Sequence, residues 1–163
     1  MVLFSSVKKS KFSLKTKISN ADALSKTPET EVNLEEALGN LVTTWSGICE
    51  IKFELSERAI RSLKRDANAR MCVNEICKEA VSNAVRHGEA KKIKISIDRS
   101  QDELLTIDVA DDGRGFWGST KPGVGSRMFN DLAMDWSLTN NRSIGRTVLQ
   151  ARLPLSVIYQ GAF

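Results

Sequence analysis

The order in which hydrophobic patterns follow one another constrains the fold of this chain more than any other feature of its sequence. Helical spacing of apolar residues dominates the first part of the patterned chain, in segments 33–46, 56–65 and 68–87. Later segments alternate apolar and polar residues, as half-buried strands do: 91–99, 103–112, 135–140 and 146–155. Helices that come early and antiparallel strands that come late predict an α+β fold, a two-layer α/β sandwich, rather than a doubly wound parallel sheet.

Turns and one earlier strand complete this outline. Segment 50–55 alternates apolar and charged side chains, so we expect a strand before the second helix. The turn at 100–102 makes an antiparallel hairpin of its flanking strands, and a turn at 140–145 joins the last two strands. A further helix is expected at 124–135. These elements predict a mixed, mostly antiparallel sheet covered on one face by helices.

Length and composition are those of one soluble domain. The chain has 163 residues, 41% of them hydrophobic and 27% charged. Residues 1–32 are polar and weakly patterned, so we interpret them as a basic tail or linker with a short strand at 12–18. Residues 33–163 are interpreted as the folded domain. No apolar run approaches the roughly 20 residues that span a bilayer, and the first residues do not have the order of a secretory signal.

The positive charge of the chain lies in the tail rather than on the domain. Six of the 24 Lys and Arg residues and one of the 20 Asp and Glu residues lie in 1–27, so this stretch carries +5 and the remainder −1. A nucleic-acid-binding domain concentrates its basic residues on a folded face, so this distribution argues against nucleic acid as a partner. The tail is interpreted as a solvated leader with at most weak affinity for anionic lipid or nucleic acid.

The cysteines indicate a reducing compartment. The chain has three, Cys49, Cys72 and Cys77, at spacings that match no metal site. Two of them lie on or near an apolar helical arc, where a free thiol behaves as a small hydrophobe. We therefore expect a cytoplasmic protein whose thiols have no redox function.

One face of the 68–87 helix carries side chains that could do chemistry. At 100° per residue, four of them fall on a single stripe: Glu79, Asn83, Arg86 and His87. The adjoining arc is suited to a core: Val73, Ile76, Cys77, Ala80, Val81 and Ala84. Gly88 follows in a position to cap the C-terminus of the helix. On its own such a stripe is better explained as a solvated face.

A glycine-containing loop follows the strand at 103–112. In the stretch VADDGRGF, Asp111 ends the strand, and Gly113 and Gly115 follow at alternate positions. Glycines at this spacing let the backbone approach a flat or charged ligand closely, and the carboxylate could accept a hydrogen bond from an exocyclic amine. The alternative is an ordinary Asp-Gly turn. The loop lacks both the Gly-Lys-Ser/Thr ending of a P-loop and the spacing of a dinucleotide fingerprint.

A second glycine pair stands at the start of the following helix. Gly123 and Gly125 leave free amides at the positive end of the helix dipole, which is a natural phosphate seat. An ordinary glycine-containing helix entry is the alternative. The residues between the two loops, 116–122, are expected to form a short mobile flap.

Beside these loops the helix stripe has a consistent chemical interpretation. The amide oxygen of Asn83 could complete the coordination of Mg²⁺, and Glu79, one turn earlier, could orient or deprotonate a nucleophile. Arg86 and His87 would lie at the height of the phosphates. Thr147, on the last strand, has a hydroxyl that could support the loop aspartate or a bound base.

Taken in order, these motifs resemble the ATP-binding domain of the GHKL, or Bergerat-fold, superfamily, which includes sensor histidine kinases, anti-sigma-factor serine kinases, gyrase and a heat-shock chaperone. The resemblance covers roughly residues 49–155. The N box is similar to Glu79-x-x-x-Asn83-x-x-Arg86-His87, the G1 box to Asp111-x-Gly113-x-Gly115, the G2 box to Gly123-x-Gly125 and the closing strand to Gly145-x-Thr147 through Pro154. Each motif is weak alone, and their common order is specific.

The resemblance implies an ATP site on a mixed sheet backed by helices. It implies that Asp111 binds the adenine amine, assisted by Thr147 through water, and that Asn83 holds Mg²⁺. Arg86 and His87 would contact phosphates. The second glycine pair, Gly123 and Gly125, would shape the phosphate-binding flap. Catalysis would then consist of positioning and charge neutralisation.

Two details discriminate within the superfamily. A glutamate at position 79 and a short flap resemble nitrate-sensor-type histidine kinases and anti-sigma serine kinases rather than gyrase or the chaperone. Segment 33–46 resembles the end of a histidine-kinase dimerisation helix, and a local helix is the alternative. Ser126 follows the second G2 glycine where many relatives carry leucine. The flap departs from the family pattern at this position, so the resemblance does not predict how it packs when closed.

His87 is the only histidine in the chain, and it lies inside the N box. A histidine kinase needs a separate acceptor histidine, so the acceptor is expected outside this chain. The resemblance therefore implies the ATP-binding catalytic domain of a bacterial sensor histidine kinase, cytoplasmic or the cytoplasmic part of a membrane-bound sensor. Its expected partners are a dimerisation-domain histidine and a response regulator, with a homodimer in the longer protein. The alternatives are a stand-alone anti-sigma-type serine kinase, with an antagonist protein as partner, and a non-catalytic nucleotide-gated binding module.

Overall fold

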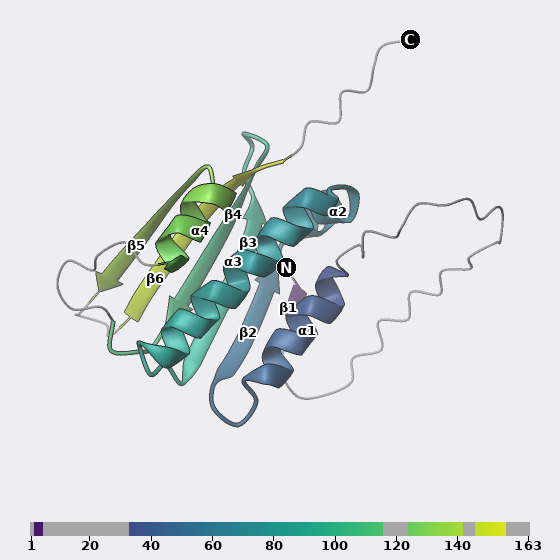
Figure 1. Cartoon of the computed structure of the whole chain (residues 1–163). Helices are drawn as coiled ribbons and strands as arrows, with labels where there is room; N and C mark the ends of the chain where they lie inside the picture. Colours follow the sequence, from purple (N-terminus) through teal and green to yellow (C-terminus); the bar gives the residue numbers. More distant parts are fainter. Residues whose placement is uncertain (1, 5–32, 116–123, 142–145, 156–163) are drawn as a thin grey trace, which may run out of the picture.

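A computed structural model describes residues 2–4, 33–115, 124–141 and 146–155 (Figure 1). Its helices are α1 (Leu34–Thr44), α2 (Glu57–Arg65), α3 (Ala67–Arg86) and α4 (Val124–Leu132). Its strands are β1 (Val2–Phe4), β2 (Glu50–Leu55), β3 (Lys92–Arg99), β4 (Leu104–Asp111), β5 (Asp135–Asn141) and β6 (Arg146–Pro154). None of the helices within the described ranges has the length and apolar character needed to cross a bilayer.

The strands form one six-stranded sheet in the order β1-β2-β3-β4-β6-β5. Among the described strands, only β2 and β3 pair in parallel, because α2 and α3 lie between them in the chain and carry it back to the starting edge of the sheet. The pairs β3–β4 and β5–β6 are antiparallel, as the two turns predicted. The predicted fold class, an α+β two-layer sandwich with a mixed, mostly antiparallel sheet, is confirmed.

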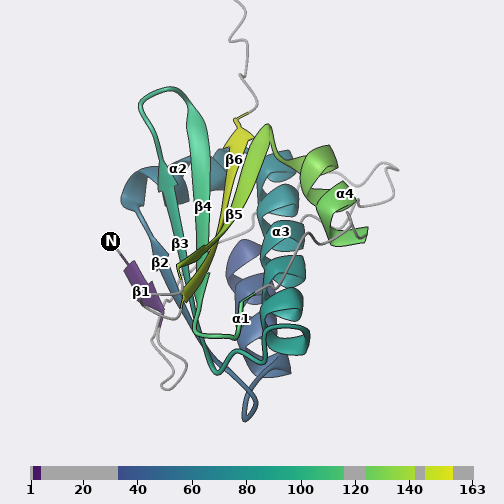
Figure 2. The same cartoon turned by 90° about the vertical axis from the view of Figure 1, so that its left-hand side faces the viewer.

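Helices cover one face of this sheet. Figure 2 shows α1, α3 and α4 side by side on the same side of the strands. The alternation of the sequence accounts for this arrangement: Ile93, Ile95 and Ile97 of β3 are buried, while Lys92 and Lys94, at the alternate positions, are exposed. Side chains on alternate positions of a strand point to opposite faces, so one face is apolar and the other polar.

The central helix α3 packs its apolar arc onto the sheet. All the residues of the predicted arc are buried: Val73, Ile76, Cys77, Ala80, Val81 and Ala84. Four of these six side chains are completely inaccessible to solvent. Burying a valine or isoleucine side chain contributes about 1.5–3 kcal/mol, so this face fixes how α3 lies on the sheet and where its polar stripe points.

Polar caps define where the early helices begin. Asn33, Ser56 and Asp66 accept hydrogen bonds from the backbone amides of Glu36, Ala59 and Ala69, at 3.3, 3.1 and 2.9 Å. A cap of this kind contributes about 1 kcal/mol. The caps at Asn33 and Ser56 confirm the predicted helix starts.

The junction between α2 and α3 is held by a buried arginine. Arg70 Nη1 donates to the carbonyl oxygens of Leu63 and Lys64, at 2.7 and 3.1 Å. These carbonyls belong to the last turn of α2, whose acceptors have no partner within the helix. The bond from α3 therefore fixes the angle at which the long helix leaves α2.

The structure differs from the sequence expectations in two places. Val2–Phe4 forms an antiparallel edge strand on β2, within the stretch interpreted as a tail. The α4 helix ends at Leu132 rather than near residue 135, because the amide of Met134 donates to the carbonyl of Arg152 at 2.8 Å and so starts the pairing of β5. The expected strand at 12–18 and flap at 116–122 lie outside the described residues.

Candidate functional site

Three motifs far apart in the sequence meet at one edge of the sheet. The last turn of α3, the end of β4 and the start of β6 lie together at the lower end of the molecule in Figure 1. The strand directions explain this, because β4 runs antiparallel to both β3 and β6. The end of β4 therefore lies beside the starts of its two neighbours.

Asp111 and Thr147 form a buried polar pair at this edge. They face each other in the register between β4 and β6, so their side chains share the helix-covered face of the sheet. Only 8% of Asp111 and 7% of Thr147 is exposed. The Thr147 hydroxyl is buried and has no hydrogen-bond partner among the described residues. A buried hydroxyl without a partner costs about 1–3 kcal/mol, which is a reason to look for a ligand or water that would satisfy it.

Burial raises the pKa of the Asp111 carboxyl above its ordinary value of 3.8. The neighbouring charge of Asp112 raises the pKa further, and the hydrogen bond that Asp111 Oδ1 accepts from the amide of Gly113, at 2.9 Å, lowers it. That bond also turns the loop back over the carboxylate. Asp111 is thus a desolvated acceptor that a donor on a ligand would stabilise.

The adjacent Asp112 has a structural role. Its Oδ1 accepts from the amides of Lys91 and Lys92, both at 2.8 Å, and so holds the start of β3 against the end of β4. Of the two consecutive aspartates, one faces the buried side of the site and the other closes the strand edge. Sequence reasoning named only the first.

Gly88 joins the end of α3 to the glycine loop. Its carbonyl oxygen accepts from the amide of Arg114 at 2.7 Å. A Cβ on Gly113 would lie 2.6 Å from that same oxygen, so any side chain there would force the loop away from the helix. The exposed Arg114–Glu89 ion pair, 2.5 Å, spans the same junction. Gly88 follows the helix end as expected, but the left-handed residue there is Glu89, with φ 54°.

Glu79 and Asn83 are connected on the half-buried stripe of α3. The Asn83 side-chain nitrogen donates to Glu79 Oε1 at 3.0 Å. Because the nitrogen is the only donor of an asparagine side chain, it is the atom that faces Glu79, and the amide oxygen is left for a cation. The hydrogen bond therefore leaves the amide oxygen of Asn83 available as a ligand, and an oxygen ligand is the kind that Mg²⁺ takes in proteins.

The last turn of α3 carries the two residues predicted to contact phosphates. His87 is exposed and caps the helix, its amide donating to the carbonyl of Asn83 at 3.0 Å. Arg86 is exposed as well, and its guanidinium lies over the ring of Trp45 at the end of α1, 5.9 Å from the centroid. Trp45 is thus a neighbour of the site that the sequence analysis did not identify.

The glycines of the two loops are only partly within the described residues. Gly115 has φ +74°, which side-chain-bearing residues seldom adopt. Gly125 belongs to the first turn of α4, as expected of a glycine at a helix entry. Gly123 and Gly145 lie outside the described residues, and their expected roles remain predictions.

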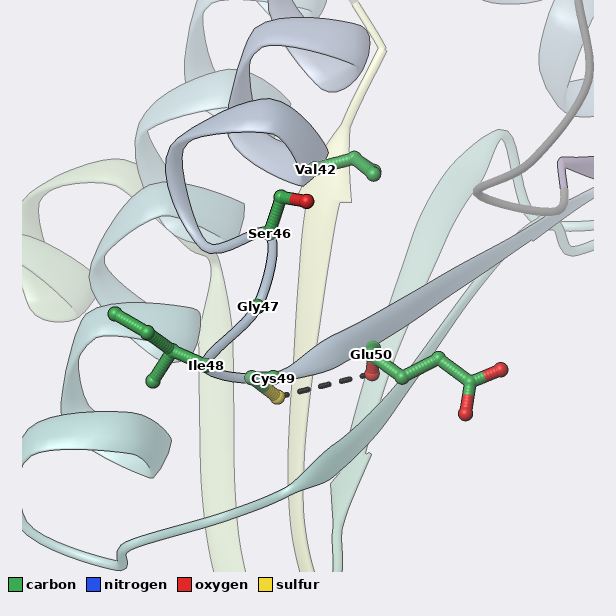
Figure 3. A pocket seen from close by; sticks show the side chains of 6 residues that line it. All are labelled: Val42, Ser46, Gly47, Ile48, Cys49 and Glu50. Atoms are coloured by element: carbon green, nitrogen blue, oxygen red, sulfur yellow. Dashed lines mark hydrogen bonds between the residues drawn. The ribbon is translucent and has the colours of Figure 1, made fainter.

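A separate pocket of about 270 Å³ lies at the turn from α1 to β2, lined by Val42, Ser46, Gly47, Ile48, Cys49 and Glu50 (Figure 3). None of the predicted site residues lines it.

Burial, and then the charges of Asp112 and Asp111, raise the pKa of the Cys49 thiol to about 11. Burial raises the pKa of Cys77 to about 12. These thiols stay protonated at neutral pH and are poor nucleophiles.

Comparison with known families shows which family the chain belongs to. The model of the family described as histidine kinase-, DNA gyrase B- and HSP90-like ATPases matches residues 69–153, just over half of the chain. The chain belongs to this family. The matched range includes both the Glu79–Asn83 stripe and the Asp111–Thr147 pair, and membership implies ATP binding. No curated protein matches the chain in sequence.

Solved structures show the same fold. The histidine kinase domain of a blue-light activated histidine kinase from Erythrobacter litoralis EL346 superposes with a TM-score of 0.57 at 17% identity, over 76% of this chain and 59% of that one. Histidine kinase AdeS from Acinetobacter baumannii gives a TM-score of 0.51 at 11% identity, over 75% of this chain and 64% of that one. The ATP binding domain of PrrB from Mycobacterium tuberculosis gives 0.50 at 18% identity, over 74% and 90%. The chain thus spans less than two thirds of the first two structures.

Proposed function

We propose that this chain is the ATP-binding catalytic domain of a sensor histidine kinase and transfers the γ-phosphoryl group of ATP to a histidine outside the chain. The observation that carries the proposal is the buried Asp111 carboxylate beside the Thr147 hydroxyl, which has no hydrogen-bond partner within the described ranges. A carboxylate and a hydroxyl on one face suit an adenine, whose 6-amino group donates to the carboxylate. The same carboxylate disfavours guanine, which presents an acceptor at that position.

The residues of α3 would hold the other end of the nucleotide. The amide oxygen of Asn83 would hold Mg²⁺, and a bound Mg²⁺ would neutralise negative charge on the phosphates. His87 and Arg86 supply donors at the exposed last turn, where Arg86 exchanges its contact with Trp45 for a phosphate oxygen. Exchanging an exposed cation–π contact costs about 0.5–1 kcal/mol, less than a charge-assisted hydrogen bond to phosphate returns.

Glu79 would act on the acceptor. Its second carboxylate oxygen accepts a hydrogen bond from one imidazole N–H, which directs the lone pair of the other ring nitrogen toward the γ-phosphorus. As the phosphorus–nitrogen bond forms, the bond from the γ-phosphorus to the bridging oxygen breaks and ADP leaves with its electron pair. The proton of the hydrogen-bonded imidazole N–H passes to the Glu79 carboxylate, which leaves the phosphorylated imidazole neutral. The bond to Asn83 keeps the carboxylate in place through this step.

Phosphotransfer to supplied partners tests the proposal. Incubated alone with labelled ATP, the chain should acquire no acid-labile label, since its single histidine is reserved for phosphate contact. A dimerisation segment that contains its own histidine should become labelled, and acid should remove that label because phosphohistidine hydrolyses in acid. Acid-stable label on an antagonist protein would instead identify the serine-kinase alternative. Absence of label on any partner, with intact nucleotide binding, would identify a nucleotide-gated binding module.

A further inference from the structure

The loop that carries the proposed adenine contact is held at two points. Gly88, at the end of α3, holds the loop through the amide of Arg114. At the other end, a Cβ added to Gly115 would lie 2.4, 2.8 and 2.9 Å from the side-chain nitrogen, carbon and oxygen of Asn140. All three atoms of the amide group therefore lie against the glycine, and the loop is packed between a helix and β5.

Asn140 belongs to the same row of side chains as the proposed base-binding pair. It faces Thr147 in the register between β5 and β6, and Thr147 in turn faces Asp111. Residues directly opposite in antiparallel strands share a face, so the three side chains lie in sequence across the helix-covered face of the sheet. Asn140 is half-buried, whereas its neighbour Thr139 is exposed.

We propose that Asn140 is a positioning residue of the nucleotide site, which braces Gly115 in its left-handed conformation and so holds the Asp111–Gly115 loop in shape for the base. This inference rests on the proposed nucleotide function. The brace acts by packing: the amide group occupies the space that a Cβ at position 115 would need, and glycine suits the left-handed backbone there. A loop held in its binding conformation before the ligand arrives does not lose binding energy to ordering.

Two substitutions separate packing from hydrogen bonding. Asn140→Ala removes the three amide-group atoms that lie against Gly115, so the affinity for ADP with Mg²⁺, measured by calorimetry, should fall roughly three- to tenfold. Asn140→Leu places two carbons where the amide oxygen and nitrogen were, and it should keep the affinity within about twofold of the original. The control Thr139→Ala, on the exposed side of the same strand, should change nothing.

A double-mutant cycle tests the contact itself. Gly115→Ala should weaken ADP binding, because the new methyl group meets the Asn140 amide and strains the backbone. Adding Asn140→Ala should then partly restore affinity, although the same change is harmful in the original chain. Three results would each overturn the brace. The losses of affinity in the double variant could be additive, Asn140→Ala could bind ADP normally, or Asn140→Leu could bind ADP as weakly as Asn140→Ala.

The same experiment separates this inference from the proposed function. Binding of ADP by the original chain that Asp111→Asn weakens, together with no effect of Asn140→Ala, would remove only the brace. Failure of the original chain to bind ADP would remove the proposed function.

Discussion

Replacement of Thr147 by valine should make the domain more stable and its nucleotide site worse. Valine has the shape of threonine with a methyl group in place of the hydroxyl. The Thr147 hydroxyl is buried without a partner among the described residues, and such a group costs about 1–3 kcal/mol. Removing it should raise the free energy of unfolding by about 1–2 kcal/mol, which corresponds to a melting temperature roughly 3–8 °C higher for a domain of this size.

Affinity should change in the opposite direction. If the hydroxyl supports a bound base, its loss removes one hydrogen bond of about 0.5–1.5 kcal/mol, so the dissociation constant of ADP should rise roughly two- to twelvefold. Thermal unfolding followed by circular dichroism and calorimetric titration with ADP measure the two effects separately. Thr106→Val, on the neighbouring strand β4 but on the open face of the sheet, is the matched control and should change neither quantity strongly.

The expected changes in stability and in ADP affinity have opposite signs, which distinguishes a ligand-facing hydroxyl from a packing role. A general packing role for Thr147 would lower stability and affinity together when the side chain is changed. A Thr147→Val variant that is less stable, or one that binds ADP with unchanged affinity, would show that the hydroxyl is not a ligand-facing group.

Three further predictions concern other residues. Glu79→Gln should leave the affinity for ADP nearly intact and lower the rate of phosphotransfer by roughly 10²–10⁴-fold. Asn83→Asp should instead change the Mg²⁺ dependence and the nucleotide affinity together. Phosphotransfer rates measured at several Mg²⁺ concentrations, together with ADP titrations, check both expectations. Because the pKa of folded Asp111 is above 3.8, the unfolded chain loses this proton first as the pH rises. The free energy of unfolding, measured relative to Asp111→Asn, should therefore fall as the pH rises from 3.8 to the raised pKa. A difference between the two proteins that stays constant over this pH range would contradict the burial of Asp111. Glu103→Gly should stabilise the domain by about 0.5–1 kcal/mol in denaturant titrations, since Glu103 has φ 59° and its exposed pair with Arg99 contributes little; a loss of stability would mean that the ion pair outweighs the strain.

The fold was largely predictable because its elements have strong local signals. The alternation of β3 and β4 and the apolar arc of α3 give the faces that are buried, and polar caps at Asn33 and Ser56 mark helix starts. The β1 strand could not be predicted in this way. It has only three residues, and its place in the sheet depends on pairing with β2, which is about fifty positions later in the chain.

The site was predictable where function requires a particular residue type at a short spacing. Glu79 and Asn83 are one helical turn apart, so the sequence already placed them side by side, and their hydrogen bond agrees. Contacts between elements gave no such signal. The packing of Gly115 against Asn140, the support of the loop by Gly88, and the position of Arg86 over Trp45 all join residues that only the folded sheet brings together.

Selectivity between ADP and GDP, measured by calorimetry with Mg²⁺ present, tests the central claim most directly. If Asp111 accepts a hydrogen bond from the adenine amine, ADP should bind the original chain and GDP should bind far more weakly. With GDP, the carboxylate would face the carbonyl oxygen of guanine, and both groups are hydrogen-bond acceptors. Asp111→Asn should weaken ADP and narrow the difference between the two nucleotides, since an amide can donate to that oxygen. Equal binding of ADP and GDP by the original chain, or no binding of either, would contradict the assignment of this edge of the sheet as an ATP site.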